Sequence, residues 1–342
     1  MNSKILKKIF SWSIFFGAFV AAALIVTYNS FYGAAIKQSK AIFVTADTQY
    51  SDFAADIKKN LSNPLKVRAF DLYASHLNLE GRLKAGHYTI KEGMSVISIV
   101  RMLVLGEQTP INLVIGEART LPQLAGKLSK QIMADSVSLL SAMRNSELKA
   151  KCGYKRDSLI AMFVPNSYQV YWTITPEKLL ERMKRESDAF WNEDRTAKLA
   201  RTKLSKYQVM TLASIVYEET KNRGEMPKIA GVYINRLRKG MPLQACPTVK
   251  YAIGDFSLTR ILYKHLRYDS PFNTYRNAGL PPAPICIPSI AAIDAVLNYE
   301  KSSYLYFCAK PEFDGTHNFA KTLSEHNANS KKYNAALAKL KK

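Results

Sequence analysis

An apolar stretch near the N-terminus sets the first limit on how this chain can fold. Residues 9–36 contain no charged side chain. The most apolar part, residues 9–28, has about the 20 residues that an α-helix needs to cross the hydrocarbon core of a bilayer. A buried core helix is the alternative, but the terminal position of the stretch and its basic flank argue against it. We therefore expect a transmembrane anchor over residues 9–31.

The residues around this stretch predict its orientation. Lys4, Lys7 and Lys8 precede it directly, and basic residues are retained on the cytoplasmic side of a membrane. Residues 1–8 are therefore expected in the cytoplasm. The predicted location is the cell inner membrane, crossed once, with the body of the protein periplasmic or otherwise extracytoplasmic. The alternative is a cleaved signal peptide with the alanines at 21–23 as its cleavage site, but the apolar run continues past them, which favours an anchor.

The charge balance of the chain is strongly basic. Lysine and arginine number 49 against 27 for aspartate and glutamate, a formal net charge of +22. Such an excess favours a polyanionic neighbour, which could be nucleic acid, anionic lipid or an acidic wall polymer. The basic residues are spread along the chain, so ordinary solvated surface charge explains them equally well. A body outside the cytoplasm argues against nucleic acid, and we expect no nucleic-acid partner.

The cysteines and histidines do not have the spacing of a metal site. None of the four cysteines belongs to a C-x-x-C pair, which leaves free thiols or one or two disulfides as the alternatives. His317 and His326 stand nine residues apart without a further ligand at zinc spacing, so we interpret them as hydrogen-bonding residues. The sequence also lacks the P-loop, serine-hydrolase and zinc-protease motifs. We expect neither a metal nor a cofactor.

The pattern of apolar residues after the anchor predicts an α+β protein. Residues 41–115 have the pattern of a small α+β unit, with strands at 41–45, 83–90 and 111–115 and helices at 50–61, 67–77 and 96–105. The rest is predicted to be mainly helical, with a capping box at Thr120 and Gln123, helices at 120–132, 206–222, 227–239 and 290–298, a proline-rich loop at 270–289 and a strand at 303–309.

The helix expected at 206–222 carries the candidate for catalysis. Val209, Leu212 and Val216 recur every three to four positions and define a buried face. Glu219 continues that face. A carboxyl group on an apolar face resists ionisation, so its pKa should rise, and a carboxyl of raised pKa is what protonation of a glycosidic oxygen requires.

Two alternatives to this interpretation stay open. The candidate carboxyl could fray into solvent at the helix end, or it could pair with Arg223 or Arg236. The preceding carboxylate, Glu218, points about 100° away around the helix. It lies near Thr211 and Ser214, on a side that we expect to be more hydrated.

Two stiff loops after this helix are predicted to bind sugar. Residues 241–251 and 270–288 mix amides, hydroxyls and aromatic rings with prolines. Aromatic rings can stack on the apolar faces of sugars while amides bind hydroxyls, and long loops in a domain often carry function. A purely structural lid is the alternative. The candidates for substrate contact are Gln244, Thr248, Asn273, Thr274 and Tyr275.

Several segments of the chain match a known pattern in the same order. They are LKAGHY at 83–88, FVPNSY at 163–168, LASIVYEET at 212–220, IAGVYINRL at 229–237, MPLQ at 241–244, PTV at 247–249, SPFNTY at 270–275, GLPP at 279–282, YLYF at 304–307 and the ending from His317 to Asn327. Together they closely resemble the endolytic murein transglycosylase, or YceG-like, family. The resemblance runs from about residue 40 to residue 330.

The resemblance implies an architecture and a reaction. The architecture is a LysM-like α+β unit at residues 38–115, behind the anchor, followed by an α+β catalytic domain at residues 116–335. The reaction is endolytic, non-hydrolytic cleavage of the MurNAc-β-1,4-GlcNAc bond of peptidoglycan glycan strands, leaving 1,6-anhydro-MurNAc ends and terminating or releasing nascent strands. Peptidoglycan synthases of the penicillin-binding class are the implied protein partners.

The resemblance also carries over to single residues. The catalytic glutamate of the family falls on Glu219, and Asn235 joins the candidates for substrate binding. The chain departs from the family at Tyr217, where many members carry glutamate, and at Cys246, where members often carry aspartate.

The number of candidate acids separates the mechanisms still open. Ordinary glycosidases use two carboxylates, whereas Glu219 is the one strong candidate in this sequence. A single acid/base is enough if the 6-hydroxyl of MurNAc is the nucleophile. A hydrolytic muramidase would need a second carboxylate or a held water, and a non-catalytic glycan-binding scaffold of wall synthesis would need no acid at all.

Overall fold

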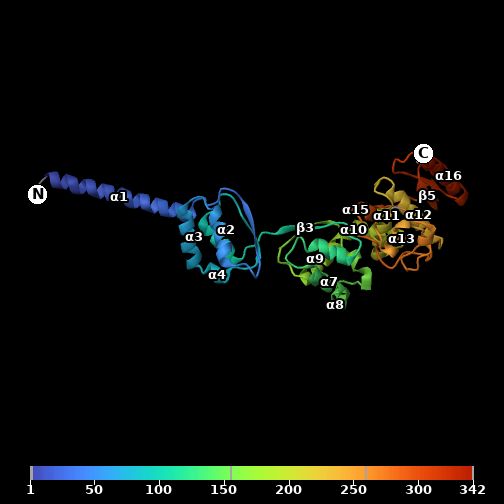
Figure 1. Ribbon diagram of the computed structural model, residues 1–342, viewed down its shortest axis with the longest axis horizontal. Coiled ribbons are helices and arrows are strands. Elements are labelled where there is room, and N and C mark those ends of the chain that lie inside the picture. The colour runs from blue at the N-terminus through green and yellow to red at the C-terminus, as the bar shows by residue number, and fades with distance from the viewer. Residues whose placement is uncertain (1–2, 155, 259, 341–342) are drawn as a thin grey trace. The chain divides into compact units, whose positions relative to one another are not determined.

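The computed structural model describes residues 3–154, 156–258 and 260–340. Its secondary structure is mixed α and β, as predicted, and the β structure of the described residues lies in three two-stranded sheets (Figure 1). The chain divides into two units. Unit 1 is residues 1–112 with 169–173, and unit 2 is residues 113–168 with 174–342.

The N-terminal helix predicted from the apolar stretch is present. Helix α1 spans Ser3–Tyr32, drawn in blue in Figure 1. Its part from Lys8 to Tyr32 has a mean hydropathy of 2.3, and none of its most apolar window is buried within the protein. By length and composition, this helix could cross a membrane or serve as a signal sequence.

The C-terminal end of α1 is fastened to unit 1 by a buried lysine. Lys66 is 4% exposed. Its Nζ donates hydrogen bonds to the carbonyl oxygens of Asn29 at 2.5 Å and Gly33 at 2.8 Å. A positive charge stabilises the negative end of a helix dipole and satisfies carbonyls that have no partner inside the helix. The end of α1 therefore belongs to the packed structure of unit 1.

Unit 1 is a two-stranded sheet with helices inserted between and after its strands. Strand β1 pairs antiparallel with β2, with Lys40 opposite Ile90 and Val44 opposite Gly86. A single core joins the sheet to the helices. The elements are β1 Lys40–Val44, α2 Tyr50–Asn60, α3 Pro64–His76, α4 Leu79–Arg82, β2 Gly86–Ile90 and α5 Val96–Leu105.

Local capping sets the helix ends in unit 1. The helix predicted at 67–77 begins three residues earlier, because the Asn63 side chain accepts a hydrogen bond from the Lys66 backbone and Pro64 fits the first turn. Helix α5 has the predicted bounds. Ser95 caps its start, and Gly106 ends it in the left-handed conformation at φ 73°.

The first part of unit 2 is mainly helical. Thr120 caps α6 through the Gln123 backbone. The predicted capping box is only half formed, because the Gln123 side chain accepts from the Arg119 backbone instead. The elements are β3 Ile111–Ile115, which pairs with β4, α6 Leu121–Leu128, α7 Ser136–Arg144, α8 Ser146–Lys151, the 3₁₀-helix η1 Arg156–Met162, β4 Asn166–Val170, α9 Pro176–Phe190 and α10 Glu193–Thr202.

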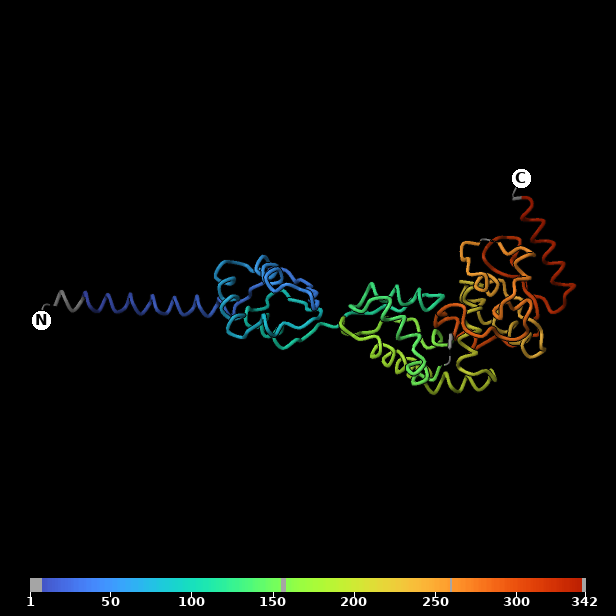
Figure 2. Tube along the Cα trace, turned by 60° about the horizontal axis from the view of Figure 1, so that its bottom comes forward, coloured from blue at the N-terminus to red at the C-terminus, as the bar shows by residue number. Residues whose placement is uncertain are grey.

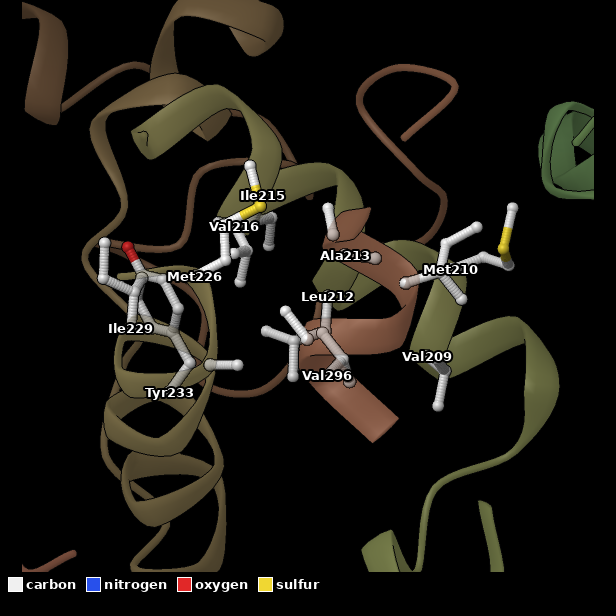
Figure 3. Packing of buried hydrophobic residues seen from close by; sticks show 14 of the residues in the cluster. Val209, Met210, Leu212, Ala213, Ile215, Val216, Met226, Ile229, Tyr233 and Val296 are labelled. Carbon is white, nitrogen blue, oxygen red and sulfur yellow. The ribbon is translucent and has the colours of Figure 1, made fainter. Parts of the chain in front are cut away.

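The second part of unit 2 is built around α11. Helices α12 and α15 pack against it and against each other, and Figure 3 shows Leu212 of α11 beside Val296 of α15. Helix α16, red in Figure 2, packs on the β5–β6 hairpin. The elements are α11 Lys206–Glu219, α12 Met226–Arg238, α13 Cys246–Ile253, α14 Tyr263–Leu266, α15 Ile290–Leu297, β5 Tyr306–Ala309, β6 His317–Ala320 and α16 Leu323–Leu340.

Two expectations for this region were wrong. Helix α11 ends at Glu219 rather than at residue 222, because Thr220 turns to an extended conformation. The segment 241–251 is not all loop, because α13 begins at Cys246 with Pro247 in its first turn. Proline was interpreted there as a loop residue, although it is equally suited to start a helix.

Candidate active site

The end of α11 opens into a pocket of about 400 Å³. The pocket lies within unit 2, and its walls come from α11, α12, α13, the loop before α13, the loop after α14, the β5–β6 hairpin and α16. The lining residues are Glu219, Tyr233, Arg236, Leu243, Gln244, Cys246, Tyr275, Phe307, Cys308, Ala309, His317 and His326.

Glu219 is the last residue of α11, and its carboxyl group lies among protein atoms at the pocket wall. The residue is half-buried because it also faces the open pocket. Its Oε1 accepts a hydrogen bond of 2.8 Å from the hydroxyl of Tyr233 on α12. Burial raises the pKa of Glu219 from 4.5 to about 7, against the opposing effects of the Tyr233 hydrogen bond and the Arg236 charge. The carboxyl can therefore hold a proton near neutral pH.

Tyr233 and Arg236 place a hydroxyl donor and a positive charge beside this carboxyl. Figure 3 shows Tyr233 among the buried side chains of α12, on the side of Val216. Burial and the neighbouring Glu219 hold the pKa of Tyr233 well above its usual value, so its hydroxyl remains a donor. Arg236 is 8% exposed, and its Nε and Nη1 donate to the carbonyls of Leu305 at 2.6 Å and Leu243 at 2.7 Å.

Gln244, Cys246 and Tyr275 also line the pocket, and Gln244 Oε1 accepts a long hydrogen bond of 3.4 Å from Nη1 of Arg236. Gln244 is exposed, and its backbone adopts the left-handed conformation at φ 52°. The Sγ of Cys246 lies 3.2 Å from the hydroxyl oxygen of Tyr275. The structure thus brings two of the predicted substrate-contact residues, Gln244 and Tyr275, to the pocket that holds Glu219.

The other predicted loop residues lie behind the pocket wall. Thr248, Asn273 and Thr274 are at most 1% exposed. The Thr248 and Thr274 hydroxyls are 2.8 Å apart, and Thr274 Oγ1 also accepts from the Ala245 backbone at 3.0 Å. Asn273 Nδ2 donates to the carbonyls of Leu266 and Tyr268. Thr248 and Thr274 join the two loops to each other, Asn273 holds the second loop together, and none of the three is among the residues that line the pocket.

Asn235 also makes structural contacts. Its amide nitrogen donates to the carbonyl of Ser302 at 2.8 Å and to that of Tyr304 at 3.0 Å. It therefore fastens α12 to the segment before β5, and it is not among the residues that line the pocket.

The surroundings of Glu218 differ from the expectation. Its side chain is 13% exposed, and its two oxygens lie 3.2 Å and 2.9 Å from Nη2 of Arg119. Thr211 and Ser214, expected on a hydrated side, are fully buried. The expectation was wrong because α11 is covered all round, with the Ser214 hydroxyl accepting from the Ile285 backbone at 3.0 Å. What separates the two carboxylates is their partner, an arginine for Glu218 and a neutral tyrosine for Glu219.

Four contributors to this region were not identified as such from the sequence: Tyr233, Arg236, Glu225 and His317. Arg236 had been considered only as an ion-pair partner. His317 makes the hydrogen bonds expected of it, from its backbone nitrogen and Nδ1 to the carboxylate of Glu225, each 2.9 Å long. The expectation fails for Nδ1 of His326, which is buried and has no hydrogen-bonding partner among the described residues.

Metal-binding clusters are not found in the described part of the chain, where no three histidine, cysteine, aspartate or glutamate side chains are placed to share an ion. All four cysteines are free thiols, with Cys152 and Cys286 buried and Cys246 exposed. Although part of Cys246 is exposed, desolvation of its thiol at the pocket wall raises the pKa of that thiol, so the protonated form predominates at neutral pH. The ionisable group of this pocket best suited to proton transfer is therefore the carboxyl of Glu219.

The chain is similar to proteins that have been characterised. The model of the YceG-like family matches residues 42–332. The chain is 31% identical over 309 residues to an endolytic murein transglycosylase of Bacillus subtilis, covering 85% of this chain and 84% of that protein. A protein of the same description from Streptococcus pneumoniae strain D39 is 30% identical over 290 residues, and this chain spans 52% of its length. A crystal structure of a YceG-like protein from Listeria monocytogenes aligns with a TM-score of 0.58 at 30% identity, covering 85% of this chain and 98% of that one.

Proposed function

This chain belongs to the YceG-like family, and we propose that it is an endolytic lytic transglycosylase that cleaves the glycan strands of peptidoglycan. The bond cut is the MurNAc-β-1,4-GlcNAc linkage, and the product carries a 1,6-anhydro-MurNAc end. The observation that carries the proposal is the Glu219 carboxyl, which lines an open pocket with a pKa raised to about 7.

In this reaction Glu219 acts as the general acid. A carboxyl with a pKa near 7 is protonated in much of the protein at neutral pH and can deliver its proton to the leaving oxygen of GlcNAc. Tyr233 and the charge of Arg236 then stabilise the carboxylate that remains. The muramyl 6-hydroxyl closes on C1, so no water enters the product and no second catalytic carboxylate is needed.

We assign the predicted binding residues to two tasks. Gln244 and Tyr275 face the pocket and are proposed to contact the sugar directly. Thr248, Asn273 and Thr274 hold the loops that carry them, and Asn235 holds the β5–β6 hairpin wall through the segment before β5. Substrate contact by these four residues, as predicted from the sequence, would require the loops to open.

The rest of the chain is proposed to place this site at the cell wall. Residues 9–31 anchor the protein in the inner membrane, with residues 1–8 cytoplasmic. Residues 38–115 form a LysM-like unit that grips glycan, a role supported by the two longer helices, α2 and α3, and the short helix α4 that lie between its paired strands β1 and β2. Residues 116–335 form the catalytic domain, which ends nascent strands beside peptidoglycan synthases of the penicillin-binding class.

Digestion of purified peptidoglycan followed by mass analysis tests the function. We expect internal cuts that leave 1,6-anhydro-MurNAc ends, which are lighter by one water than reducing ends. Reducing ends would show a hydrolytic muramidase instead. Intact strands that nevertheless bind the protein would show a non-catalytic scaffold. Either result contradicts the proposal.

A further inference from the structure

A histidine and a glutamate form a closely held pair at the pocket wall. His317 begins β6 and lines the pocket, and Glu225 lies directly before α12. Glu225 Oε2 lies 2.9 Å from His317 Nδ1, and Glu225 Oε1 accepts from the His317 backbone nitrogen at 2.9 Å. Both side chains are 15% exposed. The carboxylate thus binds one residue with both of its oxygens.

This use of Glu225 sets it apart from an ordinary helix cap. A carboxylate at a helix N-terminus usually accepts from the free backbone N–H groups of the first turn. Glu225 occupies the cap position of α12, but its side chain makes no such bond. Its hydrogen-bonding capacity is directed to His317, so the geometry serves the histidine rather than the helix.

The pair leaves one imidazole nitrogen free. An ionised carboxylate can only accept hydrogen bonds, so the proton of a neutral His317 lies on Nδ1 and Nε2 is an unprotonated acceptor. No described residue makes a hydrogen bond to Nε2, nor is Nε2 among the buried atoms without a partner. It is therefore open to solvent.

His317 shares one wall of the pocket with the acid. The ring of Phe307 contacts both His317 and Tyr233 edge to face, with centroid distances of 5.4 Å and 5.7 Å. Tyr233 in turn holds Glu219. Of the other polar groups that line the pocket, Tyr233 donates to Glu219, Cys246 contacts Tyr275, and Nδ1 of His326 is buried. Oε1 of Glu219 stays bonded to Tyr233, so the open Nε2 of His317 is a second proton acceptor available on this wall.

We propose that His317, oriented by Glu225, is the base that accepts the proton of the muramyl 6-hydroxyl. The inference rests on the proposed function and divides its two proton transfers between two residues. The C1–O4 bond breaks, its electron pair goes to O4, and Glu219 supplies the proton. O6 bonds to C1, and its proton passes to Nε2 of His317. The imidazolium then returns a proton to the Glu219 carboxylate through solvent, so no proton is gained or lost.

Two substitutions at one position separate this role from a structural one. His317→Asn keeps a donor where Nδ1 lies and loses the Nε2 position, whereas His317→Gln keeps an acceptor near Nε2 and loses the bond to Glu225. We expect kcat on purified peptidoglycan to fall about 10²-fold in both variants, because neither amide can take up a proton, with little change in KM in His317→Asn, which keeps the link to Glu225. The residual product of His317→Asn should contain a larger share of reducing ends, because water competes with the unactivated hydroxyl.

Glu225→Gln provides a second test that keeps His317 in place. Its amide can donate to Nδ1 and move the imidazole proton to Nε2, which removes the free acceptor. We expect kcat to fall as in His317→Asn. The control is Glu300→Gln, which breaks an ion pair of 3.8 Å with Lys228 of α12 outside the pocket and should leave kcat unchanged.

The outcomes distinguish this inference from the function on which it rests. If the wild-type protein releases anhydro ends but His317→Asn remains as active as wild type while His317→Gln is impaired, His317 only links β6 to α12 and the inference is wrong. If the wild-type protein releases no anhydro ends, the proposed function fails and the inference fails with it.

Discussion

At the scale of the residue, the site depends on a balance of effects on one carboxyl group. Burial raises the pKa of Glu219, while the Tyr233 hydroxyl and the Arg236 guanidinium lower it, and the result is about 7. A stronger ion pair would leave the carboxyl without its proton, as expected for an acid beside an arginine. Glu219 instead has a neutral donor as its direct partner and a cation whose N–H groups bind backbone carbonyls.

This balance has a cost in stability that depends on pH. The pKa of Glu219 is higher in the folded protein, about 7, than the ordinary value of 4.5 expected in the unfolded chain. Ionisation of Glu219 therefore has no effect on the free energy of unfolding well below pH 4.5. It lowers that free energy as the pH rises from 4.5 through 7. The loss is at most about 3 kcal/mol, at 1.36 kcal/mol for each pKa unit.

Glu219→Gln should therefore be more stable than the wild-type protein at pH 8, because an amide carries no charge to bury. The advantage should disappear near pH 4, where the wild-type carboxyl is protonated in both states. Thermal unfolding of both proteins at the two pH values measures this. An advantage of equal size at both would show that it does not come from ionisation of Glu219.

At the scale of the element, the position of α12 depends on a close backbone contact. Glycine at 231 lets the helix approach the chain at residue 300, where a Cβ on Gly231 would lie 2.3 Å from the carbonyl oxygen of Glu300. The Glu300 backbone nitrogen also bonds to the carbonyl of Pro227 at 2.9 Å. The contact fixes α12, which carries both Tyr233 and Arg236.

Gly231→Ala should lower the free energy of unfolding by about 1–3 kcal/mol, because the added methyl meets backbone rather than a movable side chain. The matched control is Gly126→Ala in α6, where a Cβ would meet nothing within 4 Å. That change should stabilise the protein by about 0.5–1 kcal/mol through helix propensity. Denaturant unfolding compares the two, and similar effects of both would contradict the close-contact account.

Elements with a strong local signal were predictable from the sequence. Helix α5 was predicted to the residue because Ser95 and Gly106 fix its ends. The β6 strand and α16 were not predicted, because their short apolar runs gain their structure from packing on β5. Helix α13 was missed because proline was interpreted only as a loop residue.

The residues of the site also divide into those with a local sequence signal and those that depend on packing between distant segments. Glu219 followed from helical spacing, whose period is local. Its partner Tyr233 is 14 positions away on another helix, and sequence spacing does not reveal how two helices approach each other. Thr248 and Asn273 were chosen for their polar side chains, but polar side chains in a loop serve the loop itself as readily as a ligand.

At the scale of the whole molecule, the proposed anchor α1 is joined closely to the rest of unit 1. Lys66 binds the carbonyl of Asn29 in the last turn of α1 and that of Gly33 just after it, and Ala35 and Ile36 beyond the helix are already in the core of unit 1. Only residues 33 and 34 lie between the end of α1, the proposed anchor, and Ala35 in the core. We therefore expect unit 1 to remain close to the membrane surface.

The proposed orientation can be tested with protease added outside the cytoplasmic membrane. Protease added to spheroplasts should degrade the body of the protein, because all of it after α1 is proposed to lie outside the cytoplasm. A cytoplasmic marker protein should remain intact in the same sample. A body protected until the spheroplasts are lysed would show that the orientation is wrong.

The most direct test of the central claim compares two neighbouring carboxylates. In Glu219→Gln, formation of anhydro ends from purified peptidoglycan should fall by about 10²- to 10⁴-fold, while the protein stays folded and still binds glycan. Glu218→Gln breaks the ion pair with Arg119 and should reduce the rate far less. Near-normal turnover in Glu219→Gln, or loss of activity only in Glu218→Gln, would contradict the assignment of Glu219 as the catalytic acid.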